Sequence, residues 1–328
     1  MNWLPLAAIA FVLSVAAVMM IRRVLAGRLL DHPNDRSSHS APTSRGGGIA
    51  FVTVFFAMVA LLGPRGVSLV AGQGPIAAQH LLAVLGPLFV VGVIDDVRGL
   101  SAPVRYLVQV AAGVLAVHWF GRPDAINAIF GNVGEPWLAF GFSVFFFTAC
   151  VNFYNFMDGI DGIVAGCAAI QLGVLAWYLQ QPVWWLLVAA LFGFLVWNWS
   201  PAKIFMGDAG STVVGGAIAI ALLGSHGVRT SVAAIAVTLP IAGDAAYTLL
   251  RRLVRRENIF QAHKSHVYQR LNQSGWSHGV VAALYMAACL AMALLVGLHG
   301  LYGAAYGTVG LVVLLILAEL RIARATPS

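Results

Sequence analysis

Five aspartates lie in three short polar interruptions of an otherwise apolar chain, namely Asp95, Asp96, Asp158, Asp161 and Asp208. Adjacent carboxylates such as Asp95 and Asp96 repel each other unless a cation or a hydrogen-bond donor lies between them. Mg²⁺ favours oxygen ligands and usually takes one or two carboxylates, with phosphates and water completing its shell. The pattern indicates metal-assisted chemistry, with one member of the pair as general base and Asp208, set between glycines, as metal ligand.

The segment 152–162 adds amides to these carboxylates. Asn152 and Asn155, like Asp158 and Asp161, are three residues apart, a spacing that puts helical residues on one face. Glycines within the segment let the backbone approach a ligand closely. Helix capping is the competing interpretation for Asp208, for one member of the acidic pair, and for one aspartate of this segment. Capping does not account for four polar groups together.

Two polar stretches supply the basic side chains. The first carries Arg36, His39 and Arg45 and ends in a glycine run, whose free N–H groups at a helix start would suit a phosphate. The second carries arginines at 251, 252, 255 and 256, followed by His263 and His266. These arginines equally suit anchoring to anionic lipid headgroups. Two histidines without a third nitrogen or sulfur ligand do not make a zinc site.

The composition decides where such chemistry takes place. Of 328 residues, 60% are hydrophobic and 9% charged, whereas a soluble domain is roughly a quarter charged. The sequence therefore excludes a soluble enzyme, a nucleic-acid-binding domain and a disordered protein. A helix of about 20 apolar residues crosses a bilayer, so we expect a polytopic integral membrane protein with an all-α fold.

Apolar runs between polar breaks predict about eleven transmembrane helices within a single domain spanning residues 1–328. The first has no positive segment before it, which favours an uncleaved first crossing rather than a signal peptide. The predicted helices are 3–21, 47–63, 76–94, 103–120, 136–153, 161–179, 183–199, 211–224, 230–249, 279–298 and 301–320.

Successive crossings place alternate loops on opposite sides of the membrane, and the charges of these loops indicate the orientation. With the N-terminus outside, sixteen of the nineteen Lys and Arg residues fall in inner segments or in the cytoplasmic C-terminal tail, as the positive-inside rule requires. The acidic residues gather on the same face, which orientation does not demand. We therefore expect a cytoplasmic active site on loops 22–46, 95–105, 152–161, 200–211 and 250–278. An acidic, Mg²⁺-loaded cluster beside basic phosphate contacts indicates phosphoryl transfer from a cytosolic nucleotide to a membrane-held acceptor.

The ordered motifs resemble those of the polyprenyl-phosphate N-acetylhexosamine-1-phosphate transferases, also called glycosyltransferase family four. The match runs from about residue 31 to about residue 271 through DxPxxRxxH, the glycine run, DD, NxxNxxDGxDG, FMGDxGS and an HxxH loop. The tract QAHKSHVYQRL looks most like the branch that starts bacterial O-antigen. Ser265 and Gln261 depart from the usual basic loop, and no lysine precedes the glycine run, which argues against a muramoyl-pentapeptide donor.

The resemblance implies that a UDP-N-acetylhexosamine and undecaprenyl phosphate react to give undecaprenyl-diphospho-sugar and UMP. It implies Mg²⁺ as cofactor, with Mn²⁺ as the alternative, held by Asp208. Asp95 or Asp96 would deprotonate the lipid phosphate. The other implied roles are catalysis by Asp158 and His263, and substrate binding by Arg36, His39, Arg45, Asn152, Asn155, Asp161, Asn198 in the uridine pocket, Phe205 stacked on uracil, and His266.

The remaining expectations concern partners and location. We expect a multi-pass protein of the bacterial inner membrane, in contact with the lipid bilayer and with no nucleic acid; a homodimer stays open. The donor sugar, and a one-step mechanism against an aspartyl-phosphate intermediate, are also open. An ion-coupled transporter or a lipid-phosphate phosphatase are the alternative functions. UMP release that requires polyprenyl phosphate separates them, because a transporter releases none and a phosphatase yields inorganic phosphate.

Overall fold

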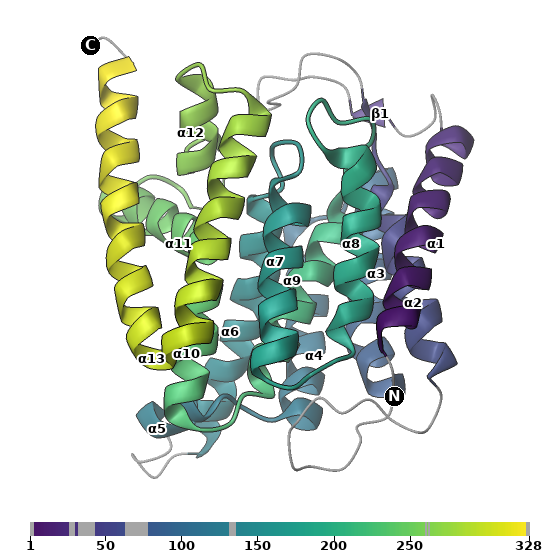
Figure 1. Cartoon of the computed structure of the whole chain (residues 1–328), viewed down its shortest axis with the longest axis horizontal. Helices are drawn as coiled ribbons and strands as arrows, with labels where there is room; N and C mark the ends of the chain where they lie inside the picture. Colours follow the sequence, from purple (N-terminus) through teal and green to yellow (C-terminus); the bar gives the residue numbers. More distant parts are fainter. Residues whose placement is uncertain are drawn as a thin grey trace.

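A computed structural model describes residues 3–25, 30–31, 43–62, 78–130, 136–259, 261 and 263–325. This part of the chain forms thirteen helices and one two-stranded antiparallel sheet (Figure 1). The elements are α1 Trp3–Val24, β1 Leu30–Asp31, β2 Thr43–Ser44, α2 Gly47–Leu61, α3 Ala78–Arg98, α4 Ala102–Phe120, α5 Asp124–Phe130, α6 Pro136–Phe156, α7 Ile163–Tyr178, α8 Trp184–Asn198, α9 Asp208–Leu223, α10 Val228–Val237, α11 Leu239–Val254, α12 Val267–Gln273 and α13 His278–Ala325.

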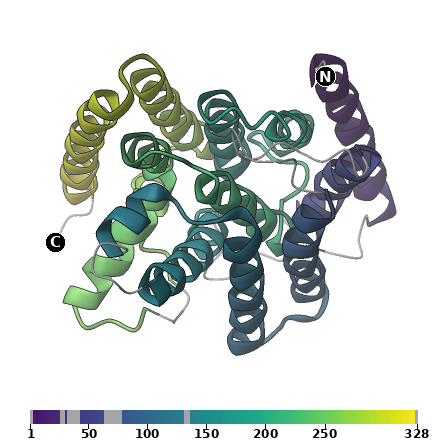
Figure 2. The ribbon, with the colours of Figure 1, turned by 90° about the horizontal axis from the view of Figure 1, so that it is seen from below.

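The predicted all-α membrane architecture is confirmed in its class. Four described helices are long and apolar enough to cross a bilayer, or six if each of two bent pairs counts as one span, and four more apolar helices are shorter. Seen end-on in Figure 2, the helices form one bundle with α1 and α13 at opposite edges. The N-terminal end of α1 and the C-terminal end of α13 lie at opposite ends of this bundle (Figure 1). The number of eleven crossings and the orientation stay predictions.

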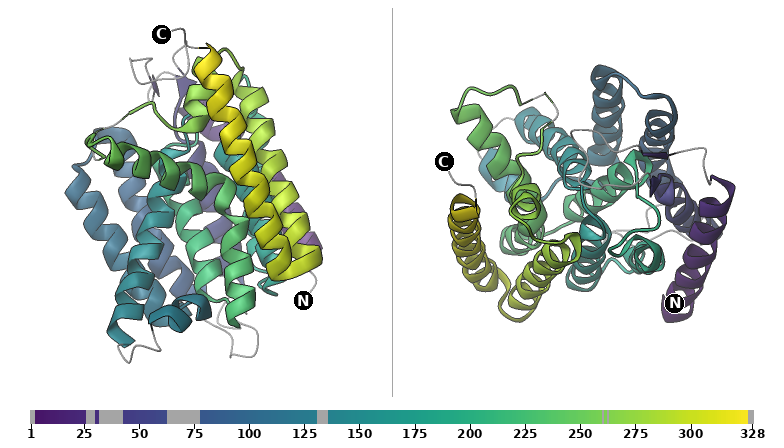
Figure 3. Two further views of the ribbon diagram at one scale, coloured as in Figure 1. Left: turned by 90° about the vertical axis from the view of Figure 1, so that its left-hand side faces the viewer. Right: turned by 90° about the horizontal axis from the view of Figure 1, so that it is seen from above.

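One predicted helix is wrong as a continuous rod. The segment 230–249 is divided into α10 and α11, which meet at 77°, and α11 lies across the bundle (Figure 3). Pro240 has no N–H and cannot donate to the carbonyl four residues earlier. The N–H of Ile241 donates to Thr238 and not to Val237, and the carbonyl of Val237 accepts a hydrogen bond from the Gln171 side chain at 3.2 Å. The break is thus stabilised by a polar side chain from α7.

Of two further boundaries, one agrees with the hydropathy pattern and the other does not. The predicted helices 279–298 and 301–320 are the two arms of α13, which bends at Gly300, where φ is 54° (Figure 3). The predicted helix 76–94 continues to Arg98, so Asp95 and Asp96 lie in the last turn of α3 and not in a loop. Carboxylates end an apolar pattern, but they do not end the backbone hydrogen bonding of a helix.

The central helix of the bundle is α9, in which every residue from Ala209 to Leu223 is buried. It packs against α2, α3, α4, α6 and α7. A helix that is apolar all round belongs inside a bundle, and helices in a bilayer associate through small residues that let backbones approach. Glycines inside the helices allow this close packing, as the contacts that follow show.

Three glycine contacts bring neighbouring helices against the first half of α9. A Cβ on Gly48 of α2 would lie 2.3 Å from the backbone nitrogen of Gly210. A Cβ on Gly92 of α3 would lie 2.6 Å from the Cα of Ala209. A Cβ on Gly215 would lie 2.7 Å from the carbonyl oxygen of Cys150 on α6. Because Gly92 is about one turn before Asp95 and Asp96, this approach carries the acidic pair to the start of α9.

These contacts predict that Gly48→Ala destabilises the protein, because the added methyl meets backbone and not a movable side chain. We expect a loss of about 1–3 kcal/mol, the usual cost of overpacking, measured as a lower thermal unfolding midpoint in detergent. Gly141→Ala in α6 is the control, since a Cβ there meets nothing within 4 Å. Equal midpoints for the two variants would contradict the close approach of α2 and α9.

Candidate active site

The carboxylate of Asp96 caps the N-terminus of α9. It accepts hydrogen bonds from the backbone N–H groups of Asp208 at 2.9 Å and Ala209 at 3.1 Å. The first N–H groups of a helix have no partner within the helix, and its positive dipole end favours an anion. A Cβ on Gly207 would lie 2.6 Å from Oδ2 of Asp96, so glycine is required before the helix. Asp96 is a cap supplied by another helix.

Asp95 and Asp208 share one cation, the guanidinium of Arg105 on α4. Nη1 of Arg105 lies 2.7 Å from Oδ2 of Asp95 and 3.1 Å from Oδ2 of Asp208. Oδ1 of Asp95 also accepts a hydrogen bond from the backbone N–H of Leu100. Sequence reasoning counted Arg105 only for orientation and missed it as a site residue. The available signal was a cation ten residues after the acidic pair, in the same inner segment.

The amides of α6 have different partners. Asn155 donates to Oγ of Ser211 at 3.0 Å, one turn into α9 from Asp208. Asn152 donates to Oε1 of Gln109 on α4 at 2.7 Å and to the carbonyl of Thr148 at 2.8 Å. Asn155 therefore lies beside the start of α9, whereas Asn152 links α6 to α4.

Asp158 follows α6 and belongs to the same cluster. Burial raises the pKa of its carboxyl well above the usual value, and the charges of Asp208 and Asp96 raise this pKa further. The Arg45 guanidinium acts in the opposite direction and lowers the pKa. Three predicted carboxylate segments and Arg45 thus meet at one end of the bundle. The net effect favours the protonated form of Asp158 until another cation approaches.

Asp161 and Asn198 are already engaged in structural contacts. Asp161 accepts a hydrogen bond from the N–H of Ala202 at 3.1 Å and lies 3.2 Å from Nδ1 of His278. Burial raises the pKa of Asp161, but the hydrogen bond and charge of His278 outweigh this and lower it overall. Asn198 accepts from the N–H of Gly162 at 3.0 Å and donates to the carbonyl of Ile204 at 2.9 Å. Their contact with a nucleotide stays a prediction.

Two of the three glycines in the run do not offer free N–H groups, so the interpretation as a phosphate site is wrong for Gly47 and Gly48. The N–H groups of Gly47 and Gly48 donate to the carbonyls of Phe205 and Met206 at 2.9 and 2.8 Å. The N–H of Phe205 in turn donates to the carbonyl of Ser44 at 2.9 Å. These bonds join the segment before α2 to the segment before α9, and they place Arg45 beside the carboxylates. Whether Phe205 stacks on uracil stays a prediction, and Arg36 and His39 lie outside the described residues.

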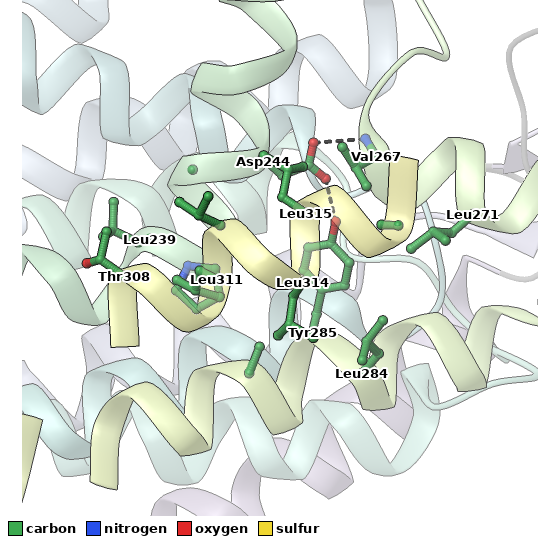
Figure 4. A pocket seen from close by; sticks show the side chains of 15 residues that line it. Leu239, Asp244, Val267, Leu271, Leu284, Tyr285, Thr308, Leu311, Leu314 and Leu315 are labelled. Atoms are coloured by element: carbon green, nitrogen blue, oxygen red, sulfur yellow. Dashed lines mark hydrogen bonds between the residues drawn. The ribbon is translucent and has the colours of Figure 1, made fainter. Parts of the chain in front are cut away.

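His266 is the N-cap of α12 and is 2% exposed. The buried Asp244 of α11 lies beneath it, with Oδ1 3.8 Å from Nδ1 of His266. The Asp244 carboxylate accepts hydrogen bonds from the N–H of Val267 at 2.8 Å and from the Tyr285 hydroxyl at 2.6 Å (Figure 4). It also accepts one from the N–H of Tyr268 at 3.1 Å. Asp244, which no motif singled out, therefore holds the start of α12 in place.

His263 lies next to His266, with 4.9 Å between the ring centroids. Its Nδ1 lies 2.9 Å from Oγ of Ser265, the residue that departs from the usual basic loop. Burial lowers the pKa of His263 to about 4, and the charges of His266, Arg252 and Arg251 act in the same direction. His263 is therefore neutral at neutral pH in the substrate-free protein.

The histidine loop and the Asp158 segment are packed together. The Tyr268 hydroxyl donates to the carbonyl of Phe156 at 3.0 Å. A Cβ on Gly159 would lie 2.2 Å from the oxygen of that hydroxyl, so the glycine admits the tyrosine. Asp158 and α12 are thus held at the same end of the bundle.

A cavity of about 230 Å³ lies between α11, α12 and the two arms of α13 (Figure 4). Its walls are mainly aliphatic, with Leu239, Leu284, Leu311 and Leu315 among them, and the Asp244 carboxylate on its wall is already hydrogen-bonded. Such walls suit hydrocarbon and not phosphate. Polar chemistry therefore belongs to the carboxylate cluster.

The donor atoms of that cluster are hard oxygen ligands. In the described part of the chain, no group of three or more His, Cys, Asp or Glu side chains is arranged to hold a metal by itself. Mg²⁺, however, is usually bound by one or two carboxylates together with substrate phosphates. The adjoining oxygens of Asp95 and Asp208 meet this requirement.

Comparisons with known proteins agree with this geometry. A family model described as Glycosyl transferase family 4 matches residues 78–226. The probable undecaprenyl-phosphate N-acetylglucosaminyl 1-phosphate transferase of Bacillus subtilis (strain 168) is 28% identical over 299 residues, covering 85% of this chain and 81% of the relative. The undecaprenyl-phosphate alpha-N-acetylglucosaminyl 1-phosphate transferase of Escherichia coli (strain K12) is 26% identical over 272 residues, covering 76% and 70%. Residues 78–226 are therefore similar to glycosyl transferase family 4, and the two relatives extend this similarity over most of the chain.

These matches agree with the resemblance inferred from the ordered motifs. A phospho-N-acetylmuramoyl-pentapeptide-transferase of Listeria monocytogenes serotype 4b is 28% identical over 237 residues, covering 65% of this chain and 72% of the relative. The region matched by the family model contains Asp95, Asp96, Arg105, Asp158 and Asp208, and it ends before the histidine loop. The bacterial relatives and the membrane-spanning helices make this a bacterial membrane protein.

The contacts of Asp244 predict that Asp244→Ala loosens the histidine loop. Buried donors left without an acceptor cost about 1–3 kcal/mol each, so the start of α12 should open. Trypsin should then cut faster after Lys264 and Arg270, as followed by mass spectrometry in detergent.

Asp124→Ala is the matched control. It removes a carboxylate that accepts the N–H of Gly227 at 2.7 Å, at the end of the bundle opposite to α12 (Figure 1). If cleavage after Lys264 rose equally in both variants, or in neither, Asp244 would not be what holds the loop.

Proposed function

We propose that the protein transfers N-acetylhexosamine-1-phosphate from a UDP-sugar to undecaprenyl phosphate, releasing UMP and forming undecaprenyl-diphospho-sugar. One observation carries the proposal: carboxylates from α3, α9 and the segment after α6 meet beside Arg105 and Arg45 at one end of the bundle. Relatives named as undecaprenyl-phosphate N-acetylglucosaminyl 1-phosphate transferases support it. We further propose a cytoplasmic site in the inner membrane and a role in the first membrane step of O-antigen or a related envelope glycan.

Asp208 would hold Mg²⁺, or Mn²⁺ in its place, with Asp95 as the neighbouring carboxylate. When bound, the ion would neutralise charge on the phosphoryl oxygens. Hard oxygen ligands from two helices suit such an ion, and Asn155 and Ser211 support the start of α9 beside them. Arg45 adds a fixed positive charge on the side of Asp158.

The reaction would be a direct displacement at the sugar-linked phosphorus of the donor. An oxygen of the lipid phosphate attacks this phosphorus, a new P–O bond forms, and the bond to UMP breaks with its electron pair left on UMP. Asp95 or Asp96 would take the proton of the lipid phosphate; both carboxylates already accept hydrogen bonds, Asp96 from two N–H groups of α9 and Asp95 from Leu100 and Arg105. A carboxylate can also act as a nucleophile, and a two-step route through an aspartyl phosphate is the competing mechanism.

The decisive experiment measures UMP release by purified protein supplied with a panel of UDP-N-acetylhexosamines, undecaprenyl phosphate and Mg²⁺. We expect UMP only when the lipid phosphate and the divalent ion are both present. Asp208→Asn should lower turnover by at least ~10²-fold, the usual effect of losing one group that stabilises transition-state charge. Asp124→Asn, at the opposite end of the bundle, should keep its turnover.

Other products would overturn the proposal. Inorganic phosphate released from the lipid phosphate would indicate a phosphatase, and absence of any released nucleotide would favour a transporter. Normal Mg²⁺-dependent turnover of Asp208→Asn would leave the transferase function standing and remove Asp208 as the metal ligand.

A further inference from the structure

A single nitrogen atom bridges two carboxylates at the centre of the site. Nη1 of Arg105 contacts Oδ2 of Asp95 and Oδ2 of Asp208, at 2.7 and 3.1 Å, from residues on three different helices. Two anionic groups held this close by the packing of α3 against α9 repel each other, and a cation between them offsets the repulsion. The position between the two oxygens is therefore a cation position, filled here by a side chain.

We propose that Arg105 occupies the place of a divalent cation between Asp95 and Asp208 in the metal-free protein, and that a cation which displaces it frees its guanidinium to bind the donor phosphates. The proposal rests on the proposed function for the identity of the donor. It concerns the exchange of two cations on one carboxylate pair, which goes beyond the assignment of Asp208 as a ligand.

The exchange follows from shared atoms and like charge. Mg²⁺ binds carboxylate oxygens at about 2.0–2.1 Å, so an ion on these oxygens and the Arg105 nitrogen would compete for the same lone pairs. The ion and the guanidinium are both positive and repel each other. Binding of one therefore weakens the binding of the other, and the coupling is reciprocal.

The remaining donors of Arg105 indicate where the side chain goes after displacement. Among contacts with described residues, its hydrogen bonds use Nη1 alone, and 35% of the side chain is exposed. The guanidinium has five donors in a planar fork that matches phosphate oxygens. Nη2 and Nε are thus available for a phosphate at the edge of the carboxylate cluster, and displacement by a cation would free Nη1 as well.

If Arg105 has this role, its removal has opposite effects on the affinity for the metal and on turnover. Its removal should strengthen binding of the metal, because the competitor is gone, and should weaken catalysis, because a phosphate contact is lost. A residue that merely supported the metal site would lower both. A residue that only stabilised the fold would leave the affinity for the metal unchanged.

The experiment uses Mn²⁺ binding to the purified, substrate-free protein in nanodiscs, followed by electron paramagnetic resonance of the free ion. We expect Arg105→Ala to bind Mn²⁺ at least about fivefold more tightly than the parent protein, the lower end of usual coupling between two ligands. In the transferase assay its turnover should fall at least ~10²-fold. Arg105→Lys should keep the weak Mn²⁺ binding of the parent, because an ammonium can still lie between the carboxylates, but should lose turnover with the fork.

Arg98→Ala is the matched control for net charge. Arg98 is exposed in the last turn of α3, two residues from Asp96. Its side chain makes no hydrogen bond or ion pair with a described residue. Its removal should change the Mn²⁺ affinity less than twofold, by a rough expectation for an exposed charge in screening salt. A change as large as that of Arg105→Ala would show a general field effect and overturn the exchange.

Thermal unfolding supplies a second measurement that needs no substrate. Without metal, Arg105→Ala should unfold at a lower temperature than the parent, because Asp95 and Asp208 lose their shared cation. Saturating Mg²⁺ should raise its midpoint more than that of the parent, since a ligand stabilises by mass action according to its affinity.

The outcomes separate this inference from the proposed function. Unchanged or weaker Mn²⁺ binding by Arg105→Ala, in a parent protein that releases UMP, would overturn the exchange and leave the function standing. Tighter Mn²⁺ binding by Arg105→Ala, in a parent protein that releases no UMP, would support the exchange and remove the function.

Discussion

The hydrogen bonds from the N-terminus of α9 to the Asp96 carboxylate are the contacts on which the rest of the site depends. They fix the end of α3 against the start of α9 and satisfy N–H groups that have no partner within the helix. These hydrogen bonds also determine where Asp95 and Asp208 lie. Asp95 precedes Asp96 in the chain, and Asp208 supplies one of the two N–H groups. One member of the acidic pair thus does structural work so that the other can face a ligand.

Close backbone approach makes this contact possible in a bilayer. Helices surrounded by lipid gain little from burying apolar surface against one another, so packing between small residues determines which helices meet. Gly92 meets the backbone of α9 at Ala209, and Gly48 meets it at Gly210. The N–H groups of Gly47 and Gly48 join the two segments before α2 and α9. Gly47 and Gly48 therefore connect the two segments, and their N–H groups are not free to bind a phosphate.

A second carboxylate does the same work for the histidine loop. Asp244 lies in α11, beyond the break at Pro240, and accepts the first N–H groups of α12. Buried charges in membrane helices are costly and are kept where they have partners. Asp96 and Asp244 thus each cap a helix that belongs to another part of the chain. Asp158 interacts electrostatically with Asp96 and Asp208, and the segment before it contacts Tyr268 of α12.

From the amino-acid sequence alone it follows that the protein lies in a bilayer and is built of helices. The sequence also places the carboxylates at the ends of helices, because charged groups are excluded from the bilayer core. The order of its motifs also predicted the family that the chain resembles in the comparisons. Only the tertiary structure decided which aspartate caps a helix and which one pairs with Arg105. Asp96 and the N–H of Asp208 are separated by 112 residues, and no local pattern encodes which backbone groups a side chain will meet. The hydropathy pattern also did not indicate the break at Pro240, because hydropathy records apolar content and not the direction of a helix.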